Sequence, residues 1–186
     1  MNKWTTAVLI VALALCGSGV GRAAEPKSTE PTLDQETAEA IASFKKTDSK
    51  LTKVFKESAG YAIFPSIAKG AAGIGAAHGE GEVFAKGKQI GVATMTQVTL
   101  GLQLGGQEYS ELIFFETKEA LDEFAAGQWA MSAQATAVAV AEGAGSTAKY
   151  QQGVMVFVLV KGGLMFEASI GGQKFKFTPL KNVPKY

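Results

Sequence analysis

The sequence is poor in the residues that most catalytic and metal sites use. Its 186 residues include one histidine, His78, and one cysteine, Cys16. A lone cysteine has no intramolecular disulfide partner, and structural zinc needs clusters of cysteine and histidine. A Ser-His-Asp triad would need His78 beside a nucleophile, and no G-x-S-x-G nucleophile elbow occurs in the sequence. We therefore expect no enzyme, no metal site and no cofactor.

The chain also lacks a strong net charge. It has 18 basic and 17 acidic residues, a formal net charge of +1. Removal of residues 1–23 would take away Lys3 and Arg22 but no acid, which brings the balance to about −1. A chain without a global basic field is not expected to have nucleic acid as its main partner.

The start of the chain has the pattern of a secretory signal. Lys3 precedes an apolar run over residues 7–15, and the small residues Gly21 and Ala23 predict cleavage after Ala23. The run is about half of the roughly 20 apolar residues that a transmembrane helix needs. We therefore expect an exported protein of the periplasm or outer membrane.

Two alternatives follow for the mature amino terminus. The sequence LALC approximates a bacterial lipobox, although Leu15 stands where a small residue is usual, so Cys16 is a candidate lipid-attachment residue. The other alternative is simple cleavage after Ala23. In either case residues 24–32, AEPKSTEPT, predict a flexible tether, and residues 33–186 a single domain.

Two helices are predicted directly after the tether. Thr32 and Gln35 form a capping-box pattern, and apolar residues at helical spacing predict a helix over about residues 33–46. A second helix follows within DSKLTKVFKES, with Asp48 as a candidate N-cap and Gly60 as a stop. The two helices are either continuous or kinked near Thr47.

Beyond Gly60 the pattern is that of strands. Short apolar and β-branched runs alternate with glycine, and Gly-Gly pairs at 162–163 and 171–172 are typical of hairpin turns. One helix, capped by Thr117 and ended by Gly127, interrupts them. The predicted fold class is α+β: a glycine-rich, mostly antiparallel β-sheet or barrel-like core with amphipathic amino-terminal helices and one inserted helix. The predicted strands include residues 129–141, WAMSAQATAVAVA.

The stretch PSIAKGAAGIGAAHGEGEVFAKG, residues 65–87, contains six glycines around His78. It matches neither the Walker sequence nor a dinucleotide fingerprint, because the spacing is G-x-G-x-x-x-G and a strand pattern follows where a helix should begin. We expect these glycines to permit close packing of strands. An enzyme that uses His78 with Glu80 or Glu82 is a weaker alternative.

Lysines gather near the second predicted helix. Lys46, Lys50 and Lys53 stand at i, i+4 and i+7, so we expect them to share one helical face; Lys45 and Lys56 lie close by. Phe44 and Phe55 are on the apolar side. Such a basic amphipathic helix suits an anionic bilayer surface, while an ordinary surface helix that docks its apolar side on the sheet explains the same pattern.

Several motifs together resemble the SYLF domain family, also named after a yeast actin-patch protein. Gly60, Ala62, Ile63 and Phe64 match its G-x-A-I-F opening, and GLQLGGQ at 101–107 matches G-x-x-x-G-G-Q. The closing GGLMFEASIGG has Glu167 where the family usually has glycine. The resemblance covers about residues 33–178.

The resemblance implies lipid binding without catalysis, and the export signal argues against the actin and phosphoinositide roles of eukaryotic members. We therefore expect an envelope protein that binds anionic membrane lipids, with Phe44, Phe55 and the five lysines as lipid-binding residues. The alternative is a structural module that binds an envelope protein partner or an apolar ligand.

Overall fold

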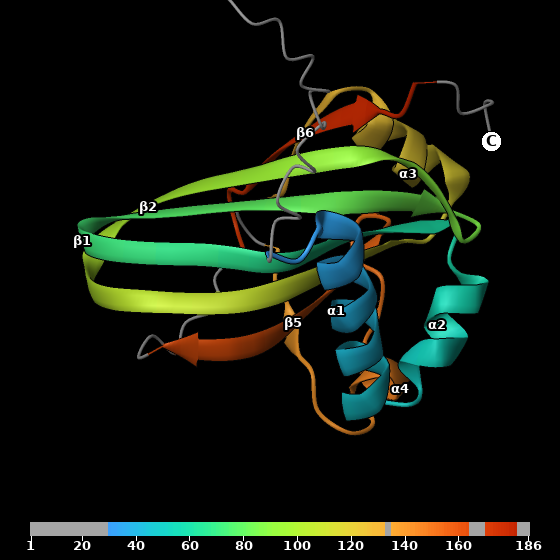
Figure 1. Cartoon of the computed structure of the whole chain (residues 1–186), viewed down its shortest axis with the longest axis horizontal. Helices are drawn as coiled ribbons and strands as arrows, with labels where there is room; N and C mark the ends of the chain where they lie inside the picture. Colours follow the sequence, from blue (N-terminus) through green and yellow to red (C-terminus); the bar gives the residue numbers. More distant parts are fainter. Residues whose placement is uncertain (1–29, 133–134, 164–169, 182–186) are drawn as a thin grey trace, which may run out of the picture. The chain divides into compact units, whose positions relative to one another are not determined.

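A long two-stranded hairpin organises the fold of this chain (Figure 1). The computed structural model describes residues 30–132, 135–163 and 170–181. Strand β1, Gly60–Ala85, pairs antiparallel with strand β2, Lys88–Phe115. Lys86 and Gly87 form the turn with φ of 48° and 77°. Both lie in the left-handed region that a two-residue type I′ hairpin turn requires.

The hairpin doubles back on itself near its middle. Both strands bend at the left end of Figure 1, where the register shifts between Ala72 and Ile74. The two halves of β1 then lie against each other: a Cβ at Gly79 would be 2.7 Å from Ile67 Cγ1, and one at Gly81 would be 2.6 Å from the Phe64 ring. Real Cβ atoms essentially never approach so closely, so these glycines are required for packing, as the sequence indicated.

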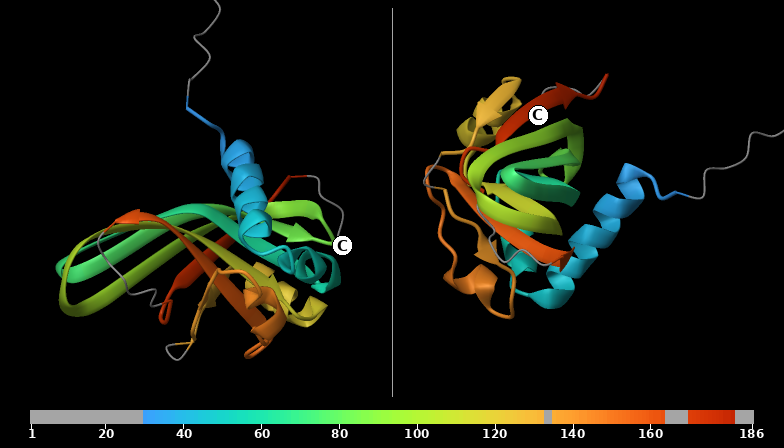
Figure 2. Two further views of the ribbon diagram at one scale, coloured as in Figure 1. Left: turned by 90° about the horizontal axis from the view of Figure 1, so that it is seen from below. Right: turned by 90° about the vertical axis from the view of Figure 1, so that its left-hand side faces the viewer.

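The rest of the sheet is built on the free edge of β2. Strand β6, Lys174–Pro179, pairs with the first part of that edge, and β5, Val154–Gly163, pairs with the last part. Strand β3, Gln128–Ala130, adds to β6, and β4, Val138–Ala139, pairs in parallel with β5. The end-on view in Figure 2 shows that the sheet curls. The predicted α+β class with a mostly antiparallel sheet is confirmed.

In the described part of the chain, four helices accompany the sheet. Helix α1, Leu33–Thr47, begins with the predicted capping box of Thr32 and Gln35, and α2 covers Leu51–Glu57. Helix α3, Lys118–Ala125, is capped by Thr117 as predicted, and α4 is a single turn over Ala144–Thr147. Within the described residues, no helix combines the length and apolar character that crossing a bilayer requires.

The core occupies both faces of the sheet. Ile113 and Phe115 of β2 point to one face, where α3 and β6 pack, while Leu112 and Phe114 point to the other, where α1 and α2 pack. All four side chains are fully buried. This two-sided burial explains why the end of β2 is an uninterrupted apolar run and does not alternate.

Several predicted elements need correction. The separate runs between residues 60 and 115 are two continuous strands, because bulges bend them without ending them. Gly162 and Gly163 are paired within β5 and form no turn, whereas Gly171 and Gly172 do turn before β6. Of residues 129–141, described apart from 133 and 134, only β3 and β4 contain strand.

Candidate lipid-binding surface and a pocket under the sheet

The junction of α1 and α2 positions the predicted lipid-binding lysines. Asp48 ends α1 with an extended backbone, φ −141° and ψ 104°, and is almost fully buried. Its carboxylate accepts the N–H of Lys50 at 3.0 Å and that of Gly145 in α4 at 2.6 Å. Burial alone would raise the pKa of Asp48, but these backbone donors outweigh it and hold the pKa below its usual value.

This junction resolves the question of one helix or two. The helix is interrupted between Thr47 and Leu51, so α1 and α2 are separate helices. Asp48 is the C-cap of α1, and the N-cap of α2 is Lys50 and not the predicted Asp48. The prediction that Lys46, Lys50 and Lys53 share one helical face is therefore wrong, because Lys46 belongs to α1 and Lys53 to α2.

The lysines themselves remain largely accessible. We call Lys45, Lys46, Lys50, Lys53 and Lys56 the lysine surface. All are exposed except Lys45, which is half-buried with its Nζ 4.5 Å from the centre of the Phe55 ring. Lys53 pairs with Glu57 at 3.7 Å, and both side chains are more than 60% exposed, so the pair is weak. The surface therefore presents positive charge to solvent.

The two phenylalanines predicted to bind lipid are not exposed as most of the lysines are. Phe44 is fully buried, and the half-buried Phe55 ring lies 4.9 Å from the rings of both Tyr61 and Phe114. The apolar side of these helices thus docks on the sheet, which was the ordinary alternative. In this structure Phe44 has no surface to offer a lipid, which corrects the prediction for that residue.

The glycine-rich stretch places its polar residues in different environments along one face of β1. His78 and Glu80 are exposed on the outer face, while Glu82 is buried and accepts a hydrogen bond from Gln89 Nε2 at 2.8 Å. Burial and the neighbouring Asp34 of α1 raise the pKa of Glu82 to about 7. His78, Glu80 and Glu82 occupy alternate positions on the same face of β1, but Glu82 lies beside Asp34 of α1, so Glu82 serves the contact between α1 and β1.

The described residues hold no group of three or more His, Cys, Asp and Glu side chains that could bind a metal ion. Cys16, the candidate signal over residues 1–23 and the first part of the tether, residues 24–29, lie outside the described residues. Glu167, where the sequence departs from the family pattern, lies outside them as well.

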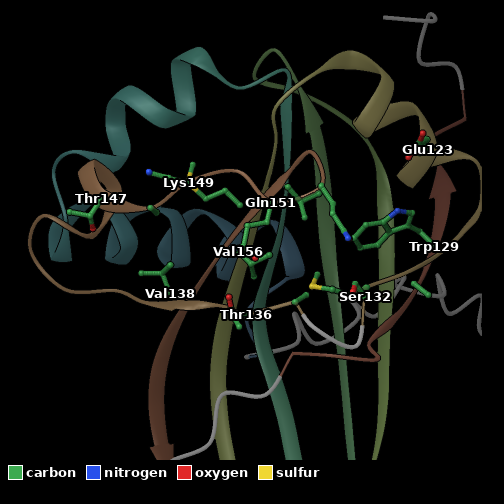
Figure 3. A pocket seen from close by; sticks show the side chains of 16 residues that line it. Glu123, Trp129, Ser132, Thr136, Val138, Thr147, Lys149, Gln151 and Val156 are labelled. Atoms are coloured by element: carbon green, nitrogen blue, oxygen red, sulfur yellow. The ribbon is translucent and has the colours of Figure 1, made fainter.

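A pocket of about 590 Å³ lies between the start of β5 and the segments before it (Figure 3). Its buried floor is apolar, made by Met131, Val154, Met155 and Val156. Figure 3 shows the lining spread from Thr147 and Lys149 at one end to Trp129 and Glu123 at the other. This volume is typical of small-molecule sites.

The rim of the pocket is mostly neutral and polar, with Ser132, Thr136, Gln151 and Gln152 among its residues. Trp129 is half-buried, since one side of its ring packs on Phe124 and Phe175 at 5.6 Å from each. Sequence reasoning missed this pocket, because it assigned much of the lining segment to a regular strand. A tryptophan followed by small and polar residues was the available signal.

The fold and these sites define an α+β protein with a curled antiparallel sheet, a cationic helical surface and an apolar pocket. Residues 96–186 match the family model described as "Ysc84: Las17-binding protein actin regulator". This match confirms the resemblance to the Ysc84 (SYLF) family that the motifs indicated. The match covers the carboxyl-terminal half, whereas the motifs extended over residues 33–178.

One relative is similar to this chain over part of its length. "Beta cell expansion factor A" of Aeromonas veronii is 34% identical over 76 residues. The alignment covers 41% of this chain and 29% of that protein. The similarity therefore concerns a minor part of the relative.

Proposed function

We propose that this protein is a non-catalytic lipid-binding protein of the bacterial cell envelope that binds anionic phospholipid through the lysine surface. The observation that carries the proposal is the exposure of Lys46, Lys50, Lys53 and Lys56 around one helix junction. Lysines near an anionic bilayer contribute about 1 kcal/mol each. The match of residues 96–186 to the SYLF family supports lipid binding, because the resemblance to that family implies it.

The burial of Phe44 determines the mode of membrane binding that we propose. Because Phe44 is fully buried, the contact is electrostatic adsorption of the lysine heads onto headgroups, without insertion of that ring into the bilayer. The two helices are held to the sheet and to α4, so the lysines are presented by a fixed scaffold. Binding should therefore weaken steeply as salt rises.

Vesicle co-sedimentation tests the proposal. The mature chain is mixed with phosphatidylcholine vesicles that contain either phosphatidylglycerol or cardiolipin, or neither, at low and high salt. The triple variant Lys46→Glu, Lys50→Glu, Lys53→Glu should bind the anionic vesicles about 100-fold more weakly, because about 1 kcal/mol is lost for each lysine.

The matched control reverses three other exposed lysines, Lys88, Lys174 and Lys176, and so has the same net charge. This control should retain most of the binding. The proposal fails if anionic vesicles do not bind the wild-type chain, or if both triple variants lose binding equally.

The pocket supports a second candidate function, the binding of an apolar ligand. Trp129 is the only tryptophan of the chain after residue 23, so its fluorescence reports on the pocket. The neutral probe N-phenyl-1-naphthylamine should quench Trp129 independently of salt. Thr136→Arg at the exposed rim should reduce the quenching, whereas Thr96→Arg on the outer face should not. Equal quenching in both variants would remove the support for this function.

A further inference from the structure

Polar side chains lie inside the curled sheet where apolar ones are expected. We call Lys69, Gln107, Tyr109, Glu111 and Gln173 the buried polar row. None is more than 6% exposed, and Glu111 and Gln173 are fully buried. Natural interiors rarely bury charged groups unless these are paired. The burial of these polar side chains therefore needs a physical explanation.

The members of the row are neighbours along the sheet. Lys69 of β1 stands directly opposite Gln107 of β2, and Tyr109 and Glu111 follow Gln107 at alternate positions on the same face of β2. Gln173, just before β6, donates from Nε2 to Glu111 Oε2 at 2.8 Å and to Tyr109 Oη at 3.4 Å. The row is thus continuous from Lys69 to Glu111.

Four atoms of the row find no hydrogen-bond partner in the described part of the chain. They are Lys69 Nζ, Gln107 Oε1, Glu111 Oε1 and Gln173 Oε1. The great majority of buried polar side-chain atoms in proteins are hydrogen-bonded, and an unpaired buried ammonium is especially unfavourable. One amino donor and three oxygen acceptors are therefore left open along the row.

Glu111 is a poor counter-ion for Lys69. Burial raises the pKa of Glu111 to about 7, although the hydrogen bond from Gln173 lowers it in part. Near neutral pH the carboxyl group is therefore protonated in a large share of molecules.

The row lies close to open space. Two rungs beyond Lys69 and Gln107, towards the bend, a Cβ at Gly105 would meet no atom within 4 Å. On the neighbouring strand β5, Val160 stands opposite Tyr109 and is 52% exposed. The strand next to the row thus reaches solvent, and there is open space beside Gly105 at one end of the row.

We propose that the buried polar row binds an anionic group that also carries hydroxyl donors, as a glycerol phosphate does. The anionic oxygens accept from Lys69 Nζ, and the hydroxyl groups donate to the open oxygens of Gln107, Gln173 and Glu111. The same chemistry occurs in the headgroup of phosphatidylglycerol and in free polyol phosphates. This site is separate from the lysine surface and does not depend on it.

Isothermal titration calorimetry of the mature chain in a phosphate-free buffer tests the site. The probes are sn-glycerol 3-phosphate, glycerol and inorganic phosphate, followed by phosphatidylcholine vesicles with and without phosphatidylglycerol. We expect glycerol 3-phosphate or the phosphatidylglycerol vesicles to bind, and Lys69→Met to weaken that binding at least 10-fold. Lys176→Met, an exposed strand lysine, is the matched control and should bind like the wild type.

A second variant keeps the test decisive if Lys69→Met folds poorly. Gln107→Leu removes an acceptor but leaves the ammonium, so it should weaken glycerol 3-phosphate more than inorganic phosphate. Binding of free glycerol 3-phosphate without vesicle binding would support this site and overturn the proposed membrane function. Vesicle binding that the helix-lysine triple variant loses and Lys69→Met retains, with no binding of the free probes, would overturn this site alone.

Discussion

The lysines of this protein occupy two opposite environments. The side chain of Lys53 on α2 is 78% exposed, whereas Lys69 on β1 is 4% exposed and its Nζ has no partner among the described residues. Water solvates the first ammonium almost fully, so its charge has little effect on folding and is free to meet a distant partner. The second has lost its water, so any group that contacts it gains a strong interaction.

The cause of the difference is the element that carries each lysine. Helices α1 and α2 pack on one face of the sheet and turn their polar sides outward, so lysine side chains reach solvent. Strand β1 is folded against itself, and its alternating pleat sends every second side chain into the interior. Lys69 is on the inward side of that pleat.

The largest effect should come from the close packing that encloses the buried polar row. Gly81→Ala places a Cβ 2.6 Å from the Phe64 ring and against the Ile63 carbonyl, so we expect a loss of about 3 kcal/mol or a failure to fold. Gly70→Ala, where a Cβ meets nothing within 4 Å, should be tolerated. Urea unfolding followed by circular dichroism measures both. Equal stability of the two variants would show that the halves of β1 do not pack as described.

The next effect is a pH dependence located at Glu111. Because the pKa of Glu111 is raised from 4.5 to about 7 in the folded chain, folding favours the protonated carboxyl group. The free energy of unfolding contributed by Glu111 is therefore highest below pH 4.5 and falls as the pH rises towards about 7. Glu82, whose pKa is also raised to about 7, adds a decrease of the same sign.

Glu111→Gln isolates this contribution, because the amide keeps a polar group beside Gln173 but cannot ionise. At pH 8 it should be more stable than the wild type by on the order of 2 to 3 kcal/mol, and near pH 4 about equal to it. Thermal unfolding across this pH range provides the comparison. A difference that does not vary with pH would contradict the assignment.

A smaller gain is expected from Lys69→Met without ligand. The thioether chain fills similar volume and removes an unpaired buried ammonium, so unfolding in phosphate-free buffer should require about 2 kcal/mol more. Urea titration of the purified variant measures the change. A loss of more than 1 kcal/mol would mean that Lys69 is paired in solution.

The smallest effect belongs to the exposed set. Lys53→Met removes an ion pair to Glu57 that spans 3.7 Å on the surface, and should change stability by less than about 0.5 kcal/mol. The same urea titration serves here. A change as large as that at Lys69 would remove the distinction between the two environments.

The helices were predictable because their signals are local. The capping box at Thr32 and Gln35, the Thr117 cap and the apolar spacing act within a few residues of each other. The break at Asp48 was not predictable, because its carboxylate bonds Gly145, 97 residues away along the chain. Likewise, the docking of Phe44 depends on partners such as Phe114 and Phe157 that only the sheet brings near.

The strands show the same division. Alternation at Phe175 and Phe177 identified β6, and the glycine-rich stretch indicated close packing. The pocket beside Trp129 and the buried polar row are each made of residues from several strands and loops. No single segment of the sequence therefore predicts either of them. The sequence around Lys69 is rich in glycine and does not indicate on which face of the strand its side chain lies.

The sequence by itself determined the α+β class, the family motifs, the three longer helices and the number and type of the charges. Tertiary structure decided which of those charges water can reach. The physical reason is that helix caps and apolar periodicity act between neighbours in the chain, whereas burial depends on segments that meet only after the β1–β2 hairpin has folded over.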